Sequence, residues 1–264
     1  MAEYANLLFE IDNHIAHITF NRPEAANAFD LNLAREFSDA ARRCDENRQV
    51  RAVLLSGAGR MFCAGGDLKS FAQQPPAELP DYLRRVTHFL HNAITLFAHA
   101  RAPVVAAVHG SAAGAGMSLT CACDFVVAAE SAKFTMAYTR AGLTPDGSAT
   151  YFLPRIVGWR KARELMMTNS ILSARDALAL GIATQVAPDD QLLPQALALA
   201  GELATGATLA LGGVKRLLLQ SSTNSLDAQM ARETQWITDM CQNHDGREGI
   251  AAFIAKRLPK FSGE

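Results

Sequence analysis

Long apolar runs, a charge excess and a cysteine framework are all absent from this sequence of 264 residues. No apolar run approaches the roughly 18 residues of a membrane-spanning helix. The start, Met1–Tyr4, has neither the basic residues nor the apolar stretch of a signal peptide. The 25 basic and 26 acidic side chains leave a net charge of −1, which gives no electrostatic basis for binding nucleic acid or an anionic membrane. We therefore expect a soluble, cytoplasmic protein without a nucleic-acid or membrane partner.

The five cysteines are an odd number and lie among apolar neighbours. A chain of this length can stabilise itself by burial, so a disulfide framework is not expected. Cys121 and Cys123 stand two residues apart, but no second Cys or His pair lies nearby at zinc-ligand spacing. We therefore expect reduced, buried thiols and no metal site.

Apolar side chains make up 49% of the chain, and their spacing changes along it. In the first half, short apolar runs bounded by turn residues indicate strands, and stretches with helical spacing lie between them. Beyond Gly142 helical spacing dominates. The pattern predicts strands over 6–10, 15–20, 50–55, 104–108, 125–129, 133–136 and 183–187, and helices over 30–45, 81–99, 117–121, 160–168, 174–180, 192–203, 209–219 and 226–240. An α/β core over residues 1–200 with a helical C-terminal region over 201–264 follows.

Two segments rich in small residues, Phe62–Asp67 and Gly110–Gly116, each follow a predicted strand. Small residues let the backbone approach a ligand closely and leave its N–H groups free to bind. At the start of a helix, such groups also carry the positive end of the helix dipole. Two N–H groups that converge on one oxygen would form an oxyanion hole. The alternative is a pair of tight turns under close packing.

Several segments, in their order and spacing, resemble the enoyl-CoA hydratase/isomerase (crotonase) superfamily over nearly the whole chain. These segments are Asn21–Ala25, Gly57–Arg60, Phe62–Leu68, Ala102–Gly110, Ala113–Gly116, Cys123–Asp124, Arg247–Ile250 and Phe253–Arg257. The resemblance implies an α/β fold built as a crotonase-type spiral of ββα units, with a helical C-terminal trimerisation region that forms homotrimers or dimers of trimers. It also implies an acyl-CoA thioester as substrate, with coenzyme A as part of that substrate and no separate cofactor.

The resemblance further implies that two backbone N–H groups hold the thioester oxygen, and on this chain they would belong to Gly66 and Ala115. Hydratases commonly have glycine at the second position. Any residue except proline supplies an N–H group, so Ala115 can still serve. Two fixed donors would stabilise the negative charge that forms on the oxygen when the thioester is enolised.

Residues that bind coenzyme A also follow from the resemblance. One set would line the groove for its adenosine and pantetheine parts: Ala25, Ala64, Asp67 and Leu68. Lys256 or Arg257 would reach the phosphates of coenzyme A in a neighbouring subunit. The alternative for both is a solvated charge on a terminal helix.

The acidic residue expected to do the chemistry is Asp146. Hydratases of the family position and split water with two glutamates, which would fall at Ser118 and Tyr138, and neither hydroxyl is basic enough at neutral pH. The segment 142–158 resembles ring-1,2-epoxyphenylacetyl-CoA isomerases and 4-chlorobenzoyl-CoA dehalogenases, in which an aspartate matching Asp146 is a base or a nucleophile. By composition alone, Pro145–Gly147 would be a solvated turn.

Two further residues match the dehalogenases. His91 lies on the helix predicted over 81–99, beside its apolar stripe, and matches a catalytic histidine that activates water. A lone helical histidine is otherwise a surface residue or a satisfied core residue. Tyr138 stands where those enzymes carry an aromatic residue beside the aspartate.

We therefore predict an acyl-CoA isomerase of fatty acid or aromatic acid catabolism, in which Asp146 moves a proton on an enoyl- or epoxyacyl-CoA while Gly66 and Ala115 hold the enolate oxygen. One alternative is an enoyl-CoA hydratase-like lyase, or an aroyl-CoA dehalogenase or hydrolase that uses Asp146 and His91. The other is a non-catalytic acyl-CoA-binding protein.

Overall fold

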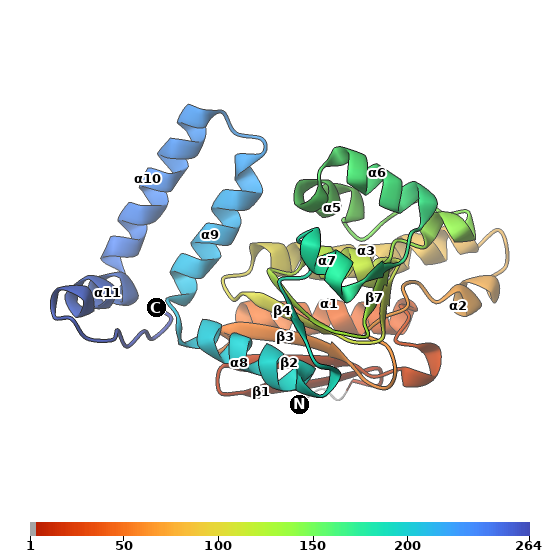
Figure 1. Cartoon of the computed structure of the whole chain (residues 1–264), viewed down its shortest axis with the longest axis horizontal. Coiled ribbons are helices and arrows are strands. Elements are labelled where there is room, and N and C mark those ends of the chain that lie inside the picture. The colour runs from red at the N-terminus through yellow and green to blue at the C-terminus, as the bar shows by residue number, and fades with distance from the viewer. Residues whose placement is uncertain (1–3) are drawn as a thin grey trace.

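The computed structural model describes residues 4–264 and contains two β-sheets, helices packed around them and a helical arm (Figure 1). Residues 1–3, which carry part of the expectation about a signal peptide, lie outside the described residues. The strands of the large sheet, in spatial order, are β1 (Leu7–Asp12), β2 (Ile15–Phe20), β3 (Ala52–Gly57), β4 (Val104–Val108), β6 (Phe125–Ala129) and β9 (Gln185–Ala187). Those of the small sheet are β5 (Ser111–Ala113), β7 (Lys133–Thr135) and β8 (Leu172–Ser173). Strands β2 to β9 of the large sheet run parallel, and β1 pairs with β2 as the predicted hairpin.

Helices connect and cover these strands. They are α1 (Leu31–Glu46), α2 (Leu68–Ala72), α3 (Leu79–His99), α4 (Ala115–Ala122), α5 (Ala149–Val157), α6 (Trp159–Thr168), α7 (Ala174–Ala179), α8 (Leu192–Thr205), α9 (Thr208–Ser221), α10 (Leu226–Gln242) and α11 (His244–Ile254). The α/β class is confirmed, and the predicted N-cap of α1 is present, because Asp30 Oδ1 accepts the N–H of Leu33 at 2.8 Å. Four short elements, α2, β5, β8 and α5, and the terminal α11 were not predicted.

A strand–strand–helix unit repeats along the chain. Strand β4 leads into β5 and α4, and β6 leads into β7 and α5, with the first strand of each pair in the large sheet and the second in the small one. After β3 the same place is taken by Cys63, which forms an isolated parallel bridge with Ala112. Successive units therefore stack side by side, and the segment after β3 lies directly against the segment after β4.

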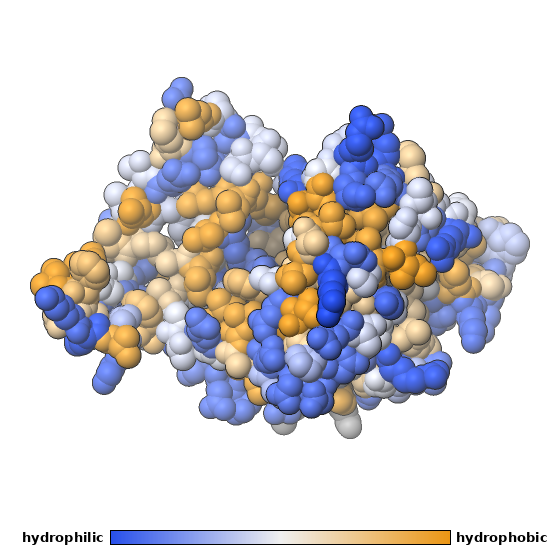
Figure 2. All heavy atoms as spheres, viewed as in Figure 1, coloured by the Kyte–Doolittle hydropathy of each residue, from blue (hydrophilic) through white to orange (hydrophobic). Residues whose placement is uncertain are grey.

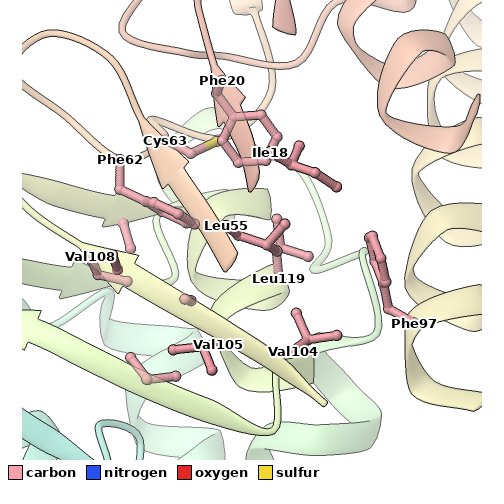
Figure 3. Packing of buried hydrophobic residues seen from close by; sticks show 14 of the residues in the cluster. Ile18, Phe20, Leu55, Phe62, Cys63, Phe97, Val104, Val105, Val108 and Leu119 are labelled. Carbon is pink, nitrogen blue, oxygen red and sulfur yellow. The ribbon is translucent and has the colours of Figure 1, made fainter. Parts of the chain in front are cut away.

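The interior between the large sheet and its helices is packed with aromatic and branched side chains (Figure 3). The ring of Phe20 contacts those of Phe29, Phe37 and Phe62 edge-on, at centroid distances of 5.4, 5.3 and 5.7 Å. Edge-to-face pairs of this kind are favourable beyond the area that they bury. Phe62 directly precedes the small-residue segment that begins at Cys63, so the core fixes the chain where that segment starts.

The arm formed by α9, α10 and α11 extends away from the sheets (Figure 1). Its base is held by the buried guanidinium of Arg51, which donates to the carbonyl of Gly206 at 2.7 Å, to Thr208 Oγ1 at 3.1 Å and to the carbonyl of Phe261 at 3.1 Å. The boundary predicted at residue 200 falls inside α8, which packs against the large sheet. The division into 1–200 and 201–264 stays a prediction.

Among residues 4–264, no single helix is long and apolar enough to cross a membrane. The segment Asp189–Thr205 reaches that length and apolarity only when it is taken together with α9, and the chain bends by 103° between the two. The five cysteines are free thiols, but Cys241 is exposed. The expectation that the thiols are buried was wrong there, because α10 belongs to the arm and buries none of its residues.

The close approach of neighbouring units predicts an asymmetry between two helical glycines. An added Cβ at Gly116 on α4 would lie 2.4 Å from the carbonyl oxygen of Cys63, whereas one at Gly201 on α8 would meet nothing within 4 Å. We expect Gly116→Ala to lower the free energy of unfolding by about 2 kcal/mol or more and Gly201→Ala to leave it unchanged or raise it by up to about 1 kcal/mol. Urea unfolding measures both, and equal effects would contradict the packing.

Candidate active site

A cavity of about 270 Å³ opens between the segment after β3, helix α3, the start of α4 and the segment around Asp146. Its walls are mostly apolar, and Asp146 is the one acidic residue among the lining residues within 4–264. The residues predicted from the sequence that line it are Ala64, Gly66, Leu68, Ala115, Tyr138 and Asp146. The fold therefore brings the two small-residue segments and the predicted acid to one apolar cavity.

The backbone N–H groups of Gly66 and Ala115, both in this lining, have no acceptor within residues 4–264. The two segments that carry them are joined by two hydrogen bonds of Cys63. Its N–H donates to the carbonyl of Ser111 at 3.1 Å, and its carbonyl accepts the N–H of Ala113 at 2.9 Å. Ala115 is the first residue of α4, where the helix dipole favours a negative ligand. Two free donors at one cavity can hold one ligand oxygen.

The approach of the two segments depends on Gly65. Its φ of +102° is a conformation that side chains rarely adopt, and an added Cβ would lie 2.9 Å from the carbonyl oxygen of Ala113 and 3.3 Å from the nitrogen of Ala115. Glycine is therefore required where the chain turns toward α4.

A charge cluster holds the other end of the same segment. The guanidinium of Arg22 lies 3.1 Å from Asp67 Oδ2 and 3.2 Å from Asp30 Oδ2. Asp67 also caps α2 by accepting the N–H of Ser70, and its own N–H donates to the carbonyl of Phe29 at 3.0 Å. Although burial opposes it, the hydrogen bonds from Ser70 and Arg22 keep the pKa of Asp67 below its ordinary value. The carboxylate next to Gly66 thus fixes the position of that residue.

The carboxyl of Asp146 is held by the phenol of Tyr138, whose oxygen lies 2.6 Å from Asp146 Oδ1. The phenol oxygen is also 2.8 Å from Ser118 Oγ. The residues at the two positions where hydratases would carry glutamate are therefore in contact with each other, and one of them contacts the acid. Burial, followed by the charge of Asp146, raises the pKa of Tyr138 above its ordinary value, so the phenol keeps its proton.

His91 lies next to the loop that carries Asp146 and does not line the cavity. Its Nε2 accepts the N–H of Gly147 at 3.2 Å and stands 3.8 Å from Asp146 Oδ2, which is beyond hydrogen-bond distance. A ring nitrogen that accepts a hydrogen bond carries no proton. In this arrangement His91 supports the backbone of the loop. Its predicted role in activating water stays a prediction.

Besides His91, four other predicted site residues do not line the cavity. Ala25 lies in a short 3-10 turn, and the side chain of Asp67 is engaged with Arg22. Lys256 and Arg257 follow α11, which lies at the end of the molecule opposite α2 (Figure 1). Arg257 pairs with Glu248 at 2.6 Å. Coenzyme A contacts for all four stay predictions.

Sequence reasoning missed much of the apolar wall. One face of α3 supplies part of it, and the segment after Tyr138 supplies more: Leu83, Val86, Thr87, Leu90, Ala141, Leu143 and Thr144. The stripe on α3 was visible in the sequence, but an apolar stripe is the same signal whether it faces the core or a cavity. No group of three or more His, Cys, Asp or Glu side chains in the described part of the chain is placed to hold a metal ion.

Known proteins resemble this chain over nearly its whole length. The profile of the family described as enoyl-CoA hydratase/isomerase matches residues 10–264. A 1,2-epoxyphenylacetyl-CoA isomerase of Escherichia coli is 37% identical over 258 residues, 98% of each chain. A 4-chlorobenzoyl coenzyme A dehalogenase of Arthrobacter is 31% identical over 92% of this chain and 88% of its own.

A solved structure supports the fold as well as the family. The crystal structure of an enoyl-CoA hydratase from Polaromonas is 36% identical, with a TM-score of 0.91 over 97% of this chain and 99% of that one. The predicted crotonase-type spiral of ββα units with a helical C-terminal region is confirmed.

The Asp67 cluster generates a pH prediction. The pKa of Asp67 is lower in the folded protein than in the unfolded chain, so its stabilisation is present above the unfolded value, near 4, and is lost as pH falls through the folded value. We expect Asp67→Asn to be less stable than the parent protein by about 2–3 kcal/mol at pH 7, with the difference shrinking below about pH 4. Urea unfolding across this range measures it. A difference independent of pH would show that the charge of Asp67 contributes nothing.

Proposed function

Because the chain belongs to the enoyl-CoA hydratase/isomerase family, we propose that it is an acyl-CoA isomerase in which Asp146 moves a proton between carbon atoms near the thioester. Enzymes of this family act on coenzyme A thioesters without a separate cofactor. The observation that carries the proposal is the single carboxylate among the lining residues, at the cavity that the free N–H groups of Gly66 and Ala115 also line.

The chemistry follows from charge placement. When a base removes a proton beside a thioester carbonyl, negative charge collects on the carbonyl oxygen. The N–H groups of Gly66 and Ala115 are fixed before the reaction, so they stabilise this charge without reorganising, and each such donor is worth about 3 kcal/mol. Asp146 supplies the base. The apolar wall suits a hydrocarbon or aromatic acyl group and limits the access of water.

The side chains beside Asp146 favour isomerisation over hydration. Water activation needs a second acid–base group, and the two positions that hold glutamates in hydratases hold Ser118 and Tyr138 here. Both are bonded to each other, and Tyr138 is bonded to Asp146. A relative named as an isomerase and one named as a probable enoyl-CoA hydratase are each 37% identical to this chain, so the choice rests on these side chains.

A test of the proposal replaces Asp146 with asparagine, which keeps the size of the side chain but cannot accept a proton from carbon. We expect Asp146→Asn to lower kcat by about 1000-fold and to leave binding of the acyl-CoA unchanged. The assay incubates the protein with enoyl- and epoxyacyl-CoA thioesters in heavy water and locates deuterium by NMR and mass spectrometry. Asp81→Asn, on the exposed first turn of α3, controls for the loss of one negative charge.

Each other outcome identifies an alternative. Full activity of Asp146→Asn refutes Asp146 as the base. A hydrated product indicates an enoyl-CoA hydratase, and halide or free coenzyme A released from aroyl-CoA indicates a dehalogenase or hydrolase that uses Asp146 and His91. Tight binding without turnover indicates an acyl-CoA-binding protein.

We also propose that the protein is a homotrimer or a dimer of trimers, assembled through the arm. Apolar side chains gather over α9 and in the hollow beside it (Figure 2). Exposed apolar residues of the arm include Val214, Leu218, Leu226, Ile237, Phe253 and Ile254. A group of exposed apolar side chains on neighbouring helices is typical of a protein–protein interface. In such an assembly Lys256 and Arg257 would serve the coenzyme A groove of a neighbour.

The assembly is tested by mass in solution. We expect native mass spectrometry to give three or six times the chain mass of 28.4 kDa. Ile237→Asp should shift the population to smaller species, because a carboxylate would have to be desolvated at the interface. Leu8→Asp, at an exposed position on β1, is the matched control and should keep the parent mass. A monomeric parent protein would overturn this proposal.

A further inference from the structure

The hydrogen bonds around Tyr138 have a defined direction. Its phenol oxygen lies 2.6 Å from Asp146 Oδ1 and 2.8 Å from Ser118 Oγ. An ionised carboxylate can only accept, so Tyr138 must donate its single hydrogen to Oδ1. The phenol oxygen can then only accept from the serine. The order of donation is Ser118 to Tyr138 to Asp146.

Burial favours donation from Ser118 to Tyr138. Its side chain is fully buried on α4, and its other hydrogen-bond partner is the carbonyl of Gly114 at 3.2 Å. Donation to that carbonyl would leave the lone pairs of two oxygens facing each other at 2.8 Å between Ser118 and Tyr138, which is costly in a low-dielectric interior. Ser118 therefore donates its hydroxyl hydrogen to the phenol oxygen of Tyr138, at 2.8 Å, and not to the carbonyl of Gly114.

The second carboxylate oxygen is in a different position. Within residues 4–264, Asp146 Oδ2 receives no hydrogen bond, and His91 Nε2 stands 3.8 Å from it. That nitrogen already accepts the N–H of Gly147, so it has no proton to donate to Oδ2. One oxygen of Asp146 is fixed by a donor and the other is free.

The loop that carries Asp146 lies close to Ser118. Gly147 has a φ of +58°, and an added Cβ there would lie 3.1 Å from the Cβ of Ser118. A side chain at position 147 would therefore crowd Ser118. Serine is small enough for the space and still carries a donor.

We infer that Ser118 is a positioning residue for the base of the isomerase reaction, acting through Tyr138. Its hydroxyl fixes the phenol, the phenol commits its proton to Oδ1, and Oδ2 is left to react. In the step, a C–H bond of the substrate breaks, an O–H bond forms at Oδ2, and the electron pair enters the thioester enolate. The O–H bond at Oδ2, whose hydrogen can exchange with solvent, then breaks as the enolate electron pair forms a C–H bond at another carbon and the thioester carbonyl is restored, so no oxidant or second reactant is needed. This inference rests on the proposed function.

The test is a double-mutant cycle with Ser118→Ala, Tyr138→Phe and both together, in the isomerase assay. A bond to a charged group is worth more than one between neutral groups, so we expect kcat to fall about 30-fold for Tyr138→Phe and about fivefold for Ser118→Ala. KM should change little, because the ring of Tyr138 still lines the cavity. In the Tyr138→Phe background, Ser118→Ala should have no further effect, since the phenol is its route to Asp146.

Thr120→Val is the matched control. Thr120 is buried on the same helix, and its hydroxyl bonds only to the carbonyl of Gly116 within the described residues, so kcat should equal that of the parent protein. An effect of Ser118→Ala that is equal in both backgrounds, or that appears in KM alone, would overturn the inference and indicate packing. An active Asp146→Asn would instead refute the proposed function, so the two failures are distinguishable.

Discussion

The whole site depends on the close approach of two backbone segments, the one after β3 and the one that opens α4. A backbone N–H can hold a ligand oxygen only if it is fixed and yet unbonded within the protein. The bridge between Cys63 and Ala112 fixes both segments, and glycine at 65 and 116 removes the Cβ atoms that would separate them. The packing of Phe62 in the aromatic core and the Arg22–Asp67 pair hold the segment after β3 at its two ends.

The carboxylate on the other side of the cavity has a different requirement. An aspartate in a loop is not oriented by its own backbone, so its direction must come from neighbours. Here they come from three elements: Tyr138 in the segment after β7, Ser118 behind it on α4, and His91 on α3, which holds the N–H of Gly147. Helix α4 thus contributes both an N–H donor at its first residue and a positioning hydroxyl one turn later.

This arrangement is consistent with relatives that have different names. An isomerase, a dehalogenase and a hydratase are all 30% or more identical to this chain. In the proposed mechanism the backbone donors would suit any reaction through a thioester oxyanion, whereas the acid and its partners would decide which bond is made or broken. We therefore infer the reaction from Asp146 and the two hydroxyl groups beside it, and not from the fold.

The sequence by itself determined the α/β class, most helices and strands, the two small-residue segments and the position of the acid. Some of these features depend on local spacing, such as the cap at Asp30. Others depend on segments that resemble a family, such as the run Phe62–Asp67. Tertiary structure alone decided which side chains meet. Arg22 and Asp67 are 45 residues apart, Ser118 and Tyr138 are 20 apart, and His91 and Gly147 are 56 apart. Local spacing fixes hydrogen bonds only within a few residues, whereas contacts at these separations exist only after the strands have paired and the helices have packed.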